Sequence, residues 1–397
     1  MNIENKKIGG HLLADQLNIN GVDTIFCVPG ESYLGLLDGL YSYSNKIKLI
    51  TTRHESGAAN MADAYAKLTN KPGICLVSRG PGATNASNGI HTAYQDSTPL
   101  ILLIGQVSRN ERDREAQQEI DYKEMFKPMA KYVAEINDAN RIPEFINKAF
   151  YISQSGRPGP VVLSLPEDML LDEVIAKPTP AAKIVQASPS VADVNKFFDK
   201  LKIAKKPIII IGGNTWSQEA INKVTNFVNK NSIPVLTSYR AQDRFDNINE
   251  NYIGHSSYAI SSKTKKRIQD SDFILSLGAR LGEVTTQGYS TLNVPKMDQY
   301  LVHVHPGIGE IGSVYYPDIA INSGMSEFSN FLPSLPQIKN PVWKDWCLKA
   351  RKEYIDYIKP TSMSGNLNFS EIIGYLNNTL ADDDIIIVGS GNNSQWV

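Results

Sequence analysis

Short apolar runs alternate with longer stretches of helical spacing along most of the chain. The helical stretches include residues 56–68, which are rich in alanine, and residues 218–229. Because strands that alternate with helices form parallel βαβ units, the pattern predicts an α/β protein whose parallel sheets are flanked by helices. The predicted strands lie at residues 26–28, 47–51, 74–78, 206–211, 233–237, 273–277 and 301–304.

The same pattern divides the chain into segments. Residues 1–172 and 189–336 are predicted to form two Rossmann-like or flavodoxin-like domains. Residues 173–188 contain a proline- and alanine-rich stretch and are predicted to be a linker between them. Residues 337–397 are expected to form a helical connector and the start of a third domain.

Two elements are predicted in that last segment. We expect a helix at residues 369–380, with Ser370 as its N-cap. An apolar run at residues 384–389 predicts a buried strand that leads into Gly391 and Asn392.

Composition and charge exclude several classes of protein. The 397 residues have a formal net charge of −1, with 20% charged and 42% hydrophobic residues, so neither a nucleic acid nor a membrane surface is expected as a partner. No apolar run has the length of a bilayer span, and the N-terminus lacks the apolar core of a signal peptide. The three cysteines match neither a disulfide framework nor a metal-binding spacing, and a cytoplasmic protein is expected.

One carboxylate and two glycine-rich turns are the candidate chemistry. Glu55 follows the predicted strand at residues 47–51 and begins the alanine-rich helix, where the helix dipole favours negative charge. Pro29-Gly30 and Gly80-Pro81-Gly82 each follow another predicted strand. Ligands of open α/β sheets bind at the carboxyl ends of the strands, so these features are predicted to face one cleft. Taken singly, a helix-starting glutamate and ordinary turn glycines remain alternatives.

The order and spacing of these motifs resemble the N-terminal, pyrimidine-binding domain of thiamine-diphosphate enzymes of the acetolactate synthase type. The resemblance covers about residues 9–168, and the second predicted domain resembles the central domain of the same enzymes. Through residues 28–33 and 239–243 the chain is similar to acetolactate-synthase-like proteins of unassigned substrate. The matching segments are Val28-Pro29-Gly30, Arg53-His54-Glu55, Gly80-Pro81-Gly82-Ala83-Thr84-Asn85, Asp96-Ser97-Thr98-Pro99-Leu100, Gly105-Gln106-Val107, Gln118-Glu119 and Ser155-Gly156-Arg157-Pro158-Gly159-Pro160-Val161.

The resemblance implies a role for each matching residue. Glu55 matches the glutamate whose carboxyl group hydrogen-bonds N1′ of the cofactor's aminopyrimidine and favours the imino form, which removes the C2 proton. Gln118 matches a glutamine near the reaction centre, with a surface polar residue as the alternative. Thiamine diphosphate would act as the electron sink when a 2-keto acid is decarboxylated and its product passed to an acceptor. The residues predicted to bind the cofactor are Pro29, Gly30, Glu55, Gly80, Pro81, Gly82, Asn85, Gly391 and Asn392.

Two departures from the family pattern limit what the resemblance implies. Gln117 stands where acetolactate synthases have an aromatic residue in contact with the substrate, so the acetolactate reaction itself stays open. Gly278-Ala279-Arg280 matches the family, but Leu281-Gly282-Glu283 departs from it, so FAD is possible and not favoured.

His303-Val304-His305 is interpreted as a strand end, and no metal ligand is predicted within the chain. His54, beside Glu55, is expected to orient the backbone or to pack.

The diphosphate-binding domain of the family carries a Gly-Asp-Gly…Asn signature that holds Mg²⁺. No Gly-Asp-Gly occurs in these 397 residues, so the Mg²⁺ ligands are expected in a missing C-terminal domain and the chain is predicted to be truncated. Three hypotheses stay open. The first is a homodimeric or homotetrameric enzyme acting on a 2-keto acid, with its active site shared between subunits. The others are a catalytically incompetent fragment, or a partner that supplies Glu55 in trans, and a FAD-like nucleotide-binding module.

Overall fold

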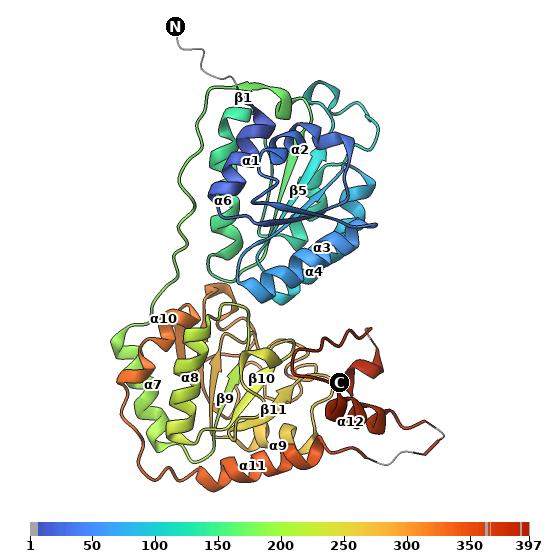
Figure 1. The fold of residues 1–397 in the computed structure, drawn as a ribbon. Helices are drawn as coiled ribbons and strands as arrows, with labels where there is room; N and C mark the ends of the chain where they lie inside the picture. The colour runs from blue at the N-terminus through green and yellow to red at the C-terminus, as the bar shows by residue number, and fades with distance from the viewer. Residues whose placement is uncertain (1–6, 362–363, 366, 390, 397) are drawn as a thin grey trace. The chain divides into compact units, whose positions relative to one another are not determined.

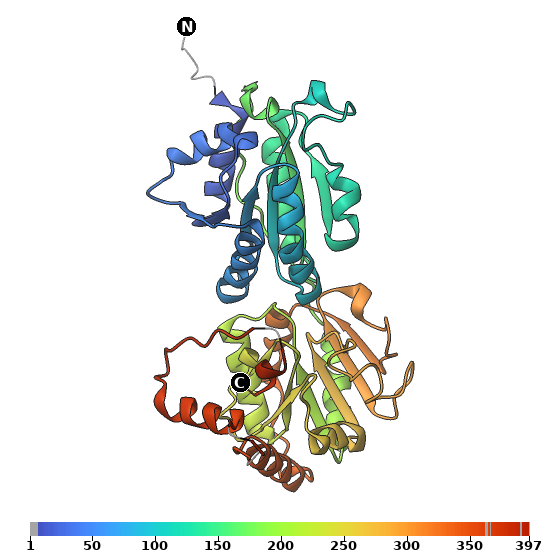
Figure 2. The same cartoon turned by 90° about the vertical axis from the view of Figure 1, so that its right-hand side faces the viewer.

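The chain forms two compact units, Met1–Ala187 and Ser188–Val397. The computed structural model describes residues 7–361, 364–365, 367–389 and 391–396. Each unit contains a six-stranded parallel sheet with helices on both faces (Figure 1; Figure 2). This arrangement confirms the predicted α/β class with parallel sheets.

The first sheet lies between two layers of helices. One face packs against α1 (Gly9–Ile19), α2 (Leu34–Tyr41) and α6 (Ile142–Gln154), and the other against α3 (Glu55–Thr69) and α4 (Pro81–Asp96). Alternate residues of the central strands enter the two cores, and burial on both faces explains their continuous apolar runs. The strand order is β3 (Lys48–Thr51), β2 (Thr24–Cys27), β4 (Gly73–Val77), β5 (Leu100–Gln106), β7 (Pro160–Pro166) and β6 (Tyr132–Glu135).

The second sheet repeats this layered arrangement with different helices. Its faces pack against α7 (Val191–Ile203), α8 (Gln218–Asn231) and α10 (Met325–Ser329) on one side, and against α9 (Ser262–Asp270) and α11 (Lys344–Tyr357) on the other. Every helix within the described ranges is too short or too polar to span a bilayer. The strand order is β11 (Tyr252–Ser256), β10 (Val235–Ser238), β9 (Pro207–Ile211), β12 (Phe273–Leu277), β13 (Tyr300–His305) and β14 (Ile319–Asn322).

The stretch predicted to be a linker begins with a short strand and is then held against the first unit. β8 (Glu173–Val174) pairs antiparallel with β1 (Lys7–Ile8). Further along, the Thr179 N–H donates to Gln16 Oε1 at 2.9 Å, and the Ala182 N–H donates to Asn20 Oδ1 at 3.0 Å. These bonds fasten an irregular segment to α1.

Two predictions for the last segment are wrong. Residues 384–389 form no strand, and Ile387 is 92% exposed. A strand needs a neighbour to complete its hydrogen-bond ladder, and no strand in the described part of the chain pairs with this run. The N-cap of α12 (Phe369–Thr379) is Asn368, whose side chain accepts from the Ser370 N–H at 3.1 Å. Ser370 is therefore in the first turn of the helix instead of capping it.

Candidate functional site

The candidate site lies at the carboxyl edge of the first sheet. β2 is parallel to β3 and β4, with Cys27 opposite Thr51 on one side and Leu76 on the other. The segments that follow these three strands therefore start from the same edge. They contain Pro29-Gly30, Glu55 and Gly80-Pro81-Gly82, as the sequence predicts.

Glu55 is the first residue of α3, and its carboxylate is fixed by one hydrogen bond. The His54 side chain caps the helix, because its Nδ1 accepts from the Ser56 N–H at 3.2 Å. The half-buried Glu55 accepts at Oε2 from Asn85 Nδ2 at 2.9 Å. Its other oxygen, Oε1, faces Gly82, where an added Cβ would lie 3.6 Å away in ordinary contact. The structure thus brings Glu55, Gly82 and Asn85 together, and His54 orients the backbone as expected.

The small residues of α3 let it pack closely on α4 in the same chain. Ala58, Ala59 and Ala62 are fully buried, and an added Cβ at Gly89 of α4 would lie only 2.5 Å from the Ala59 Cβ. This close approach brings Asn85 of α4 within reach of Glu55. Lys67 strengthens the contact, since its ammonium group is 2.7 Å from a carboxylate oxygen of Asp63 on α3 and of Asp96 on α4.

The turn after β2 interlocks with the strands beside it. An added Cβ at Gly30 would lie 2.7 Å from the Ser78 Cβ, and one at Gly105 would lie 2.1 Å from Ser32 Oγ. Ser32 Oγ and Ser78 Oγ are hydrogen-bonded at 2.9 Å. Pro29 itself is exposed. The glycines here are required by close packing between chain segments, which fixes the shape of this edge.

Gln118 lies against the turn that follows β4. Gly80 has a φ of +60°, which favours glycine, and an added Cβ would be 2.6 Å from the Gln118 Cβ. The Gly80 N–H donates to the Tyr122 hydroxyl at 2.8 Å. Gln118 is exposed and has a φ of +69°. The neighbouring Glu119 holds this loop, because its carboxylate accepts from the Asp113 N–H at 2.9 Å, which lowers the pKa of Glu119.

A hollow of about 350 Å³ lies at the same edge, beside the turn after β4. Arg79 and Glu167, which follow β4 and β7, face each other across 2.7 Å. Gln117 also lines this hollow, so the residue that departs from the family pattern borders a charged space. Sequence reasoning missed both residues. The position of Arg79 after a predicted strand is a usable signal, whereas β7, which Glu167 follows, is not among the predicted strands. The lining residues are Arg79, Val107, Glu111, Arg114, Ala116, Gln117 and Glu167.

Comparison with known families agrees with this geometry. Residues 7–125 match the N-terminal TPP binding domain of thiamine pyrophosphate enzymes, and residues 194–332 match their central domain. The chain belongs to the thiamine pyrophosphate enzymes. The first matched range contains Glu55, Asn85 and Gln118, whereas Glu167 lies beyond it.

Several thiamine pyrophosphate enzymes that are similar to this chain are acetolactate synthases. The chain is 32% identical to the acetolactate synthase large subunit of Cyanidium caldarium, over 88% of this chain and 62% of that protein. It is 29% identical to the large subunit of Lactococcus lactis subsp. lactis, over 100% of this chain and 69% of that one. The chain is 26% identical to the acetolactate synthase of Bacillus subtilis, over 99% of this chain and 69% of that protein. The chain thus spans less than two thirds of the length of the Cyanidium relative.

The central domain of this thiamine pyrophosphate enzyme uses its glycines for backbone contact. An added Cβ at Gly278 would lie 2.6 Å from the Gly212 carbonyl oxygen. Arg280 Nε donates to Glu310 Oε2 at 3.0 Å. His303 is buried in β13, and its Nε2 is 2.9 Å from the Ala279 carbonyl oxygen. His303 and His305 both lie in β13, which ends at His305, in agreement with the predicted strand end. Within the described ranges, no cluster of three or more His, Cys, Asp or Glu side chains could hold a metal ion.

Gly391 and Asn392, the remaining predicted cofactor-binding residues, belong to the second unit. Both are exposed, and Asn392 begins the short 3₁₀ helix η9 (Asn392–Gln395). Their predicted role in cofactor binding stays a prediction.

Proposed function

We propose that this chain is the pyrimidine-binding part of an enzyme that decarboxylates a 2-keto acid and joins the product to an acceptor. Glu55 is the proposed catalytic carboxyl group, hydrogen-bonded to N1′ of thiamine diphosphate. The observation that carries the proposal is the state of its two oxygens. Oε2 is held by Asn85, and Oε1 has no hydrogen-bond partner among the described residues and lies beside Gly82.

The residues of this edge fit the cofactor. A half-buried carboxyl group with one fixed oxygen can keep the other aimed at a ring nitrogen and share a proton with it. Gly82 leaves space beside that oxygen because it has no Cβ. When bound, thiamine diphosphate supplies an electron sink for the carbanion that decarboxylation leaves. Gln118, which lies against Gly80, is proposed to contact the reacting substrate.

The class of reaction is supported by the relatives, which are named acetolactate synthases. Gln117 keeps the identity of the keto acid and acceptor open, because it gives the adjacent hollow a polar wall. We propose that the active enzyme is a homodimer or homotetramer whose subunits share the site. A cytoplasmic location is part of the proposal and agrees with three unpaired, buried cysteines.

The 397 residues alone are proposed to be inactive. They contain no Gly-Asp-Gly segment, so the proposal assigns Mg²⁺ and the diphosphate to ligands elsewhere. A 2-keto acid turnover assay tests this point, and appreciable decarboxylation by the 397-residue chain would contradict it. A flavin absorbance spectrum of the purified protein tests the FAD-like alternative in the same preparation.

The central experiment uses a longer protein, here called the parent protein, in which the diphosphate-binding domain implied by the family resemblance follows these 397 residues. It is titrated with thiamine diphosphate in the presence of Mg²⁺ and followed by intrinsic fluorescence. Saturable binding is expected, and Glu55→Ala should weaken it. Oxythiamine diphosphate, which lacks the 4′-amino group, serves as a matched ligand control for the pyrimidine contact. If the parent protein binds neither compound, the proposed function is wrong.

A further inference from the structure

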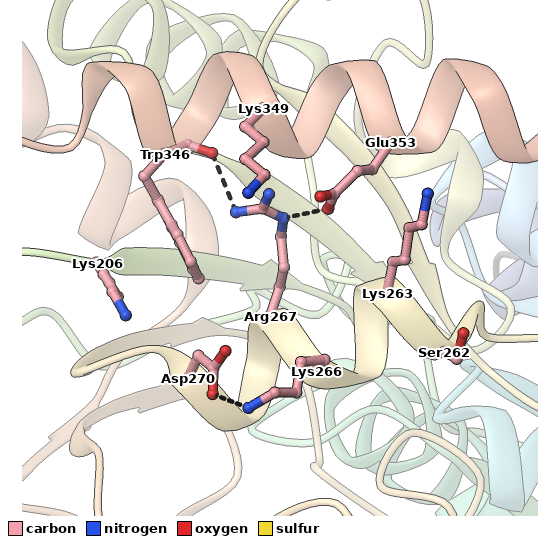
Figure 3. Close-up of a pocket in the computed structure, with 9 residues that line it drawn as sticks. All are labelled: Lys206, Ser262, Lys263, Lys266, Arg267, Asp270, Trp346, Lys349 and Glu353. Carbon is pink, nitrogen blue, oxygen red and sulfur yellow. Dashed lines mark hydrogen bonds and ion pairs between the residues drawn. The ribbon is translucent and has the colours of Figure 1, made fainter.

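A basic hollow of about 500 Å³ lies in the second unit, along α9 and α11 and away from the glycine-rich turns of that unit (Figure 3). One end reaches Lys206, the residue before β9, at the amino edge of the sheet. Figure 3 shows side chains of the two helices converging on the space between them. The residues that line it are Lys206, Ser262, Lys263, Lys266, Arg267, Asp270, Trp346, Lys349 and Glu353.

The charge of this hollow is the opposite of that of the whole protein. Five of its lining residues are cationic and two are carboxylates, an excess of three positive charges, whereas the whole chain has a net charge of −1. Gathering like charges around one space costs stability unless an anion offsets them. The charge of the hollow therefore favours an anion over a cation or a neutral ligand.

Part of this charge is fixed and part is uncommitted. Arg267, whose side chain is 8% exposed, donates to Glu353 and stacks its guanidinium 4.4 Å from the Trp346 ring centroid. The ammonium groups of Lys263 and Lys349 have no hydrogen-bond or ion-pair partner within the described part of the chain (Figure 3). The hollow therefore has one fixed cation, Arg267, and on each helix one cation that is outside any ion pair among the described residues, Lys263 on α9 and Lys349 on α11.

The spacing of the cations indicates the size of the anion. Lys263 and Arg267 are one helical turn apart on α9, Lys349 stands across from them on α11, and Lys206 lies at the far end. A helix rises about 1.5 Å per residue, so the backbone positions of Lys263 and Arg267 are about 6 Å apart along α9. Lys263 is also in the first turn of α9, where the helix dipole favours an anion. Cations spread over more than one helical turn and two helices suit a chain of two or three phosphates better than a single phosphate.

We propose that this hollow binds a small molecule that carries a diphosphate or triphosphate group. A volume of about 500 Å³ lies within the range of small-molecule sites. The phosphate chain lies between Lys263 and Lys349, with Arg267 beneath it. The site is separate from the proposed Glu55 chemistry and does not depend on it.

Isothermal titration calorimetry at low ionic strength tests the proposal with sodium tripolyphosphate, ATP without Mg²⁺, and orthophosphate. Tripolyphosphate and ATP are expected to bind at least about tenfold more tightly than orthophosphate, because more charges meet the cations. Tighter binding of ATP than of tripolyphosphate would identify a nucleotide as the source of the phosphates, and equal binding a free polyphosphate. Failure of tripolyphosphate to bind would overturn the proposal.

Matched double variants separate the site from general charge attraction. Lys263→Ala with Lys349→Ala should weaken tripolyphosphate binding about tenfold or more. Lys265→Ala with Lys352→Ala removes two charges from the same two helices outside the hollow and should change the affinity less than about twofold. Lys263→Arg with Lys349→Arg should retain binding. Equal losses in the two alanine pairs would reject the site, and so would a single-stranded oligonucleotide that competes more strongly than tripolyphosphate.

Discussion

The glycine-rich turns at the carboxyl edges of the two sheets differ in the space that they leave beside the backbone. In the second unit, an added Cβ at Gly213 would lie 2.6 Å from the Gly278 carbonyl oxygen, so backbone touches backbone and the edge is closed. In the first unit, Gly82 leaves ordinary space beside the Glu55 carboxylate. Glycines after parallel strands therefore do not identify a ligand site by themselves. A polar group with an unused bonding position beside the glycine is what distinguishes the first edge from the second.

The sharpest test of this contrast is Glu55→Gln in the longer parent protein. Glutamine keeps the shape and a bond to Asn85 but cannot share a proton with a ring nitrogen. Turnover of a 2-keto acid should fall by about a thousandfold or more, which is about 4 kcal/mol of transition-state stabilisation. Steady-state kinetics give the loss.

Circular dichroism and the urea midpoint control for folding, and both should be unchanged in Glu55→Gln. Glu31→Gln is a matched control at the same edge, since Glu31 is largely exposed and lies 3.7 Å from Arg79. A turnover rate close to that of the unmodified protein would contradict the role assigned to Glu55.

The closed edge of the second unit should respond through stability. Gly213→Ala forces a Cβ against the Gly278 carbonyl oxygen at a φ of +75°. Strain and overpacking together should lower the free energy of unfolding by about 3 kcal/mol. Urea denaturation, with a spectroscopic probe of the second unit, measures it.

Gly82→Ala is the counterpart in the first unit. Gly82 is in the first turn of α4 and has ordinary space around it, so alanine should leave the free energy of unfolding unchanged or raise it by up to about 1 kcal/mol. The affinity of the parent protein for thiamine diphosphate should fall. If both glycine variants lose the same stability, the contrast between the two edges is wrong.

The two units also differ in a histidine: His303 of the second unit is buried, whereas His91 of the first unit is exposed. Burial lowers the pKa of His303 below the ordinary histidine value, which favours its neutral form in the folded protein. The unfolded chain has a histidine pKa of about 6.5 and takes up a proton below it. The unfolded state then binds more protons, so stability is fully present above about pH 6.5 and falls with pH, by up to about 1.4 kcal/mol per pH unit.

Hydrogen exchange of β13 amides at pH 7.5 and 5.5, corrected for intrinsic rates, measures that loss. His303→Gln should reduce the pH dependence and leave the part that His255 contributes, since burial lowers the pKa of His255 as well. His91→Gln, an exposed residue of the first unit, should leave it as it is. An unchanged pH dependence in His303→Gln would exclude His303 as its cause.

The sequence predicts several of the strands whose apolar runs are buried on both faces, but it does not single out β5 and β7, which are buried along their whole length. Residues 273–277 match β12, and residues 218–229 fall within α8. It also does not single out the edge strands β11 and β14, whose runs are interrupted by polar residues such as His255 and Asn322. At residues 384–389 the error is the reverse: a buried strand is predicted and none forms. An apolar run forms a strand only when a partner strand is present.

Within the site, the pattern predicts which residues lie at the edge but not how they are fixed. The bond from Asn85 to Glu55 depends on how closely α3 packs on α4, and the pairing of Arg79 with Glu167 joins strands far apart in sequence. Both depend on tertiary distances that spacing along the chain does not encode.

The smallest expected effect concerns the residue beside the catalytic candidate. His54→Ala removes the cap of α3 and should cost about 1 kcal/mol or less, about as much as Ser261→Ala at the start of α9, where the hydroxyl accepts from the Thr264 N–H at 3.0 Å. His54→Asn should restore the cap and keep turnover of the parent protein within a few-fold of normal. Urea denaturation and steady-state kinetics measure the two quantities separately. If His54→Asn is stable yet loses as much turnover as Glu55→Gln, the imidazole takes part in the chemistry and helix capping does not explain its place beside Glu55.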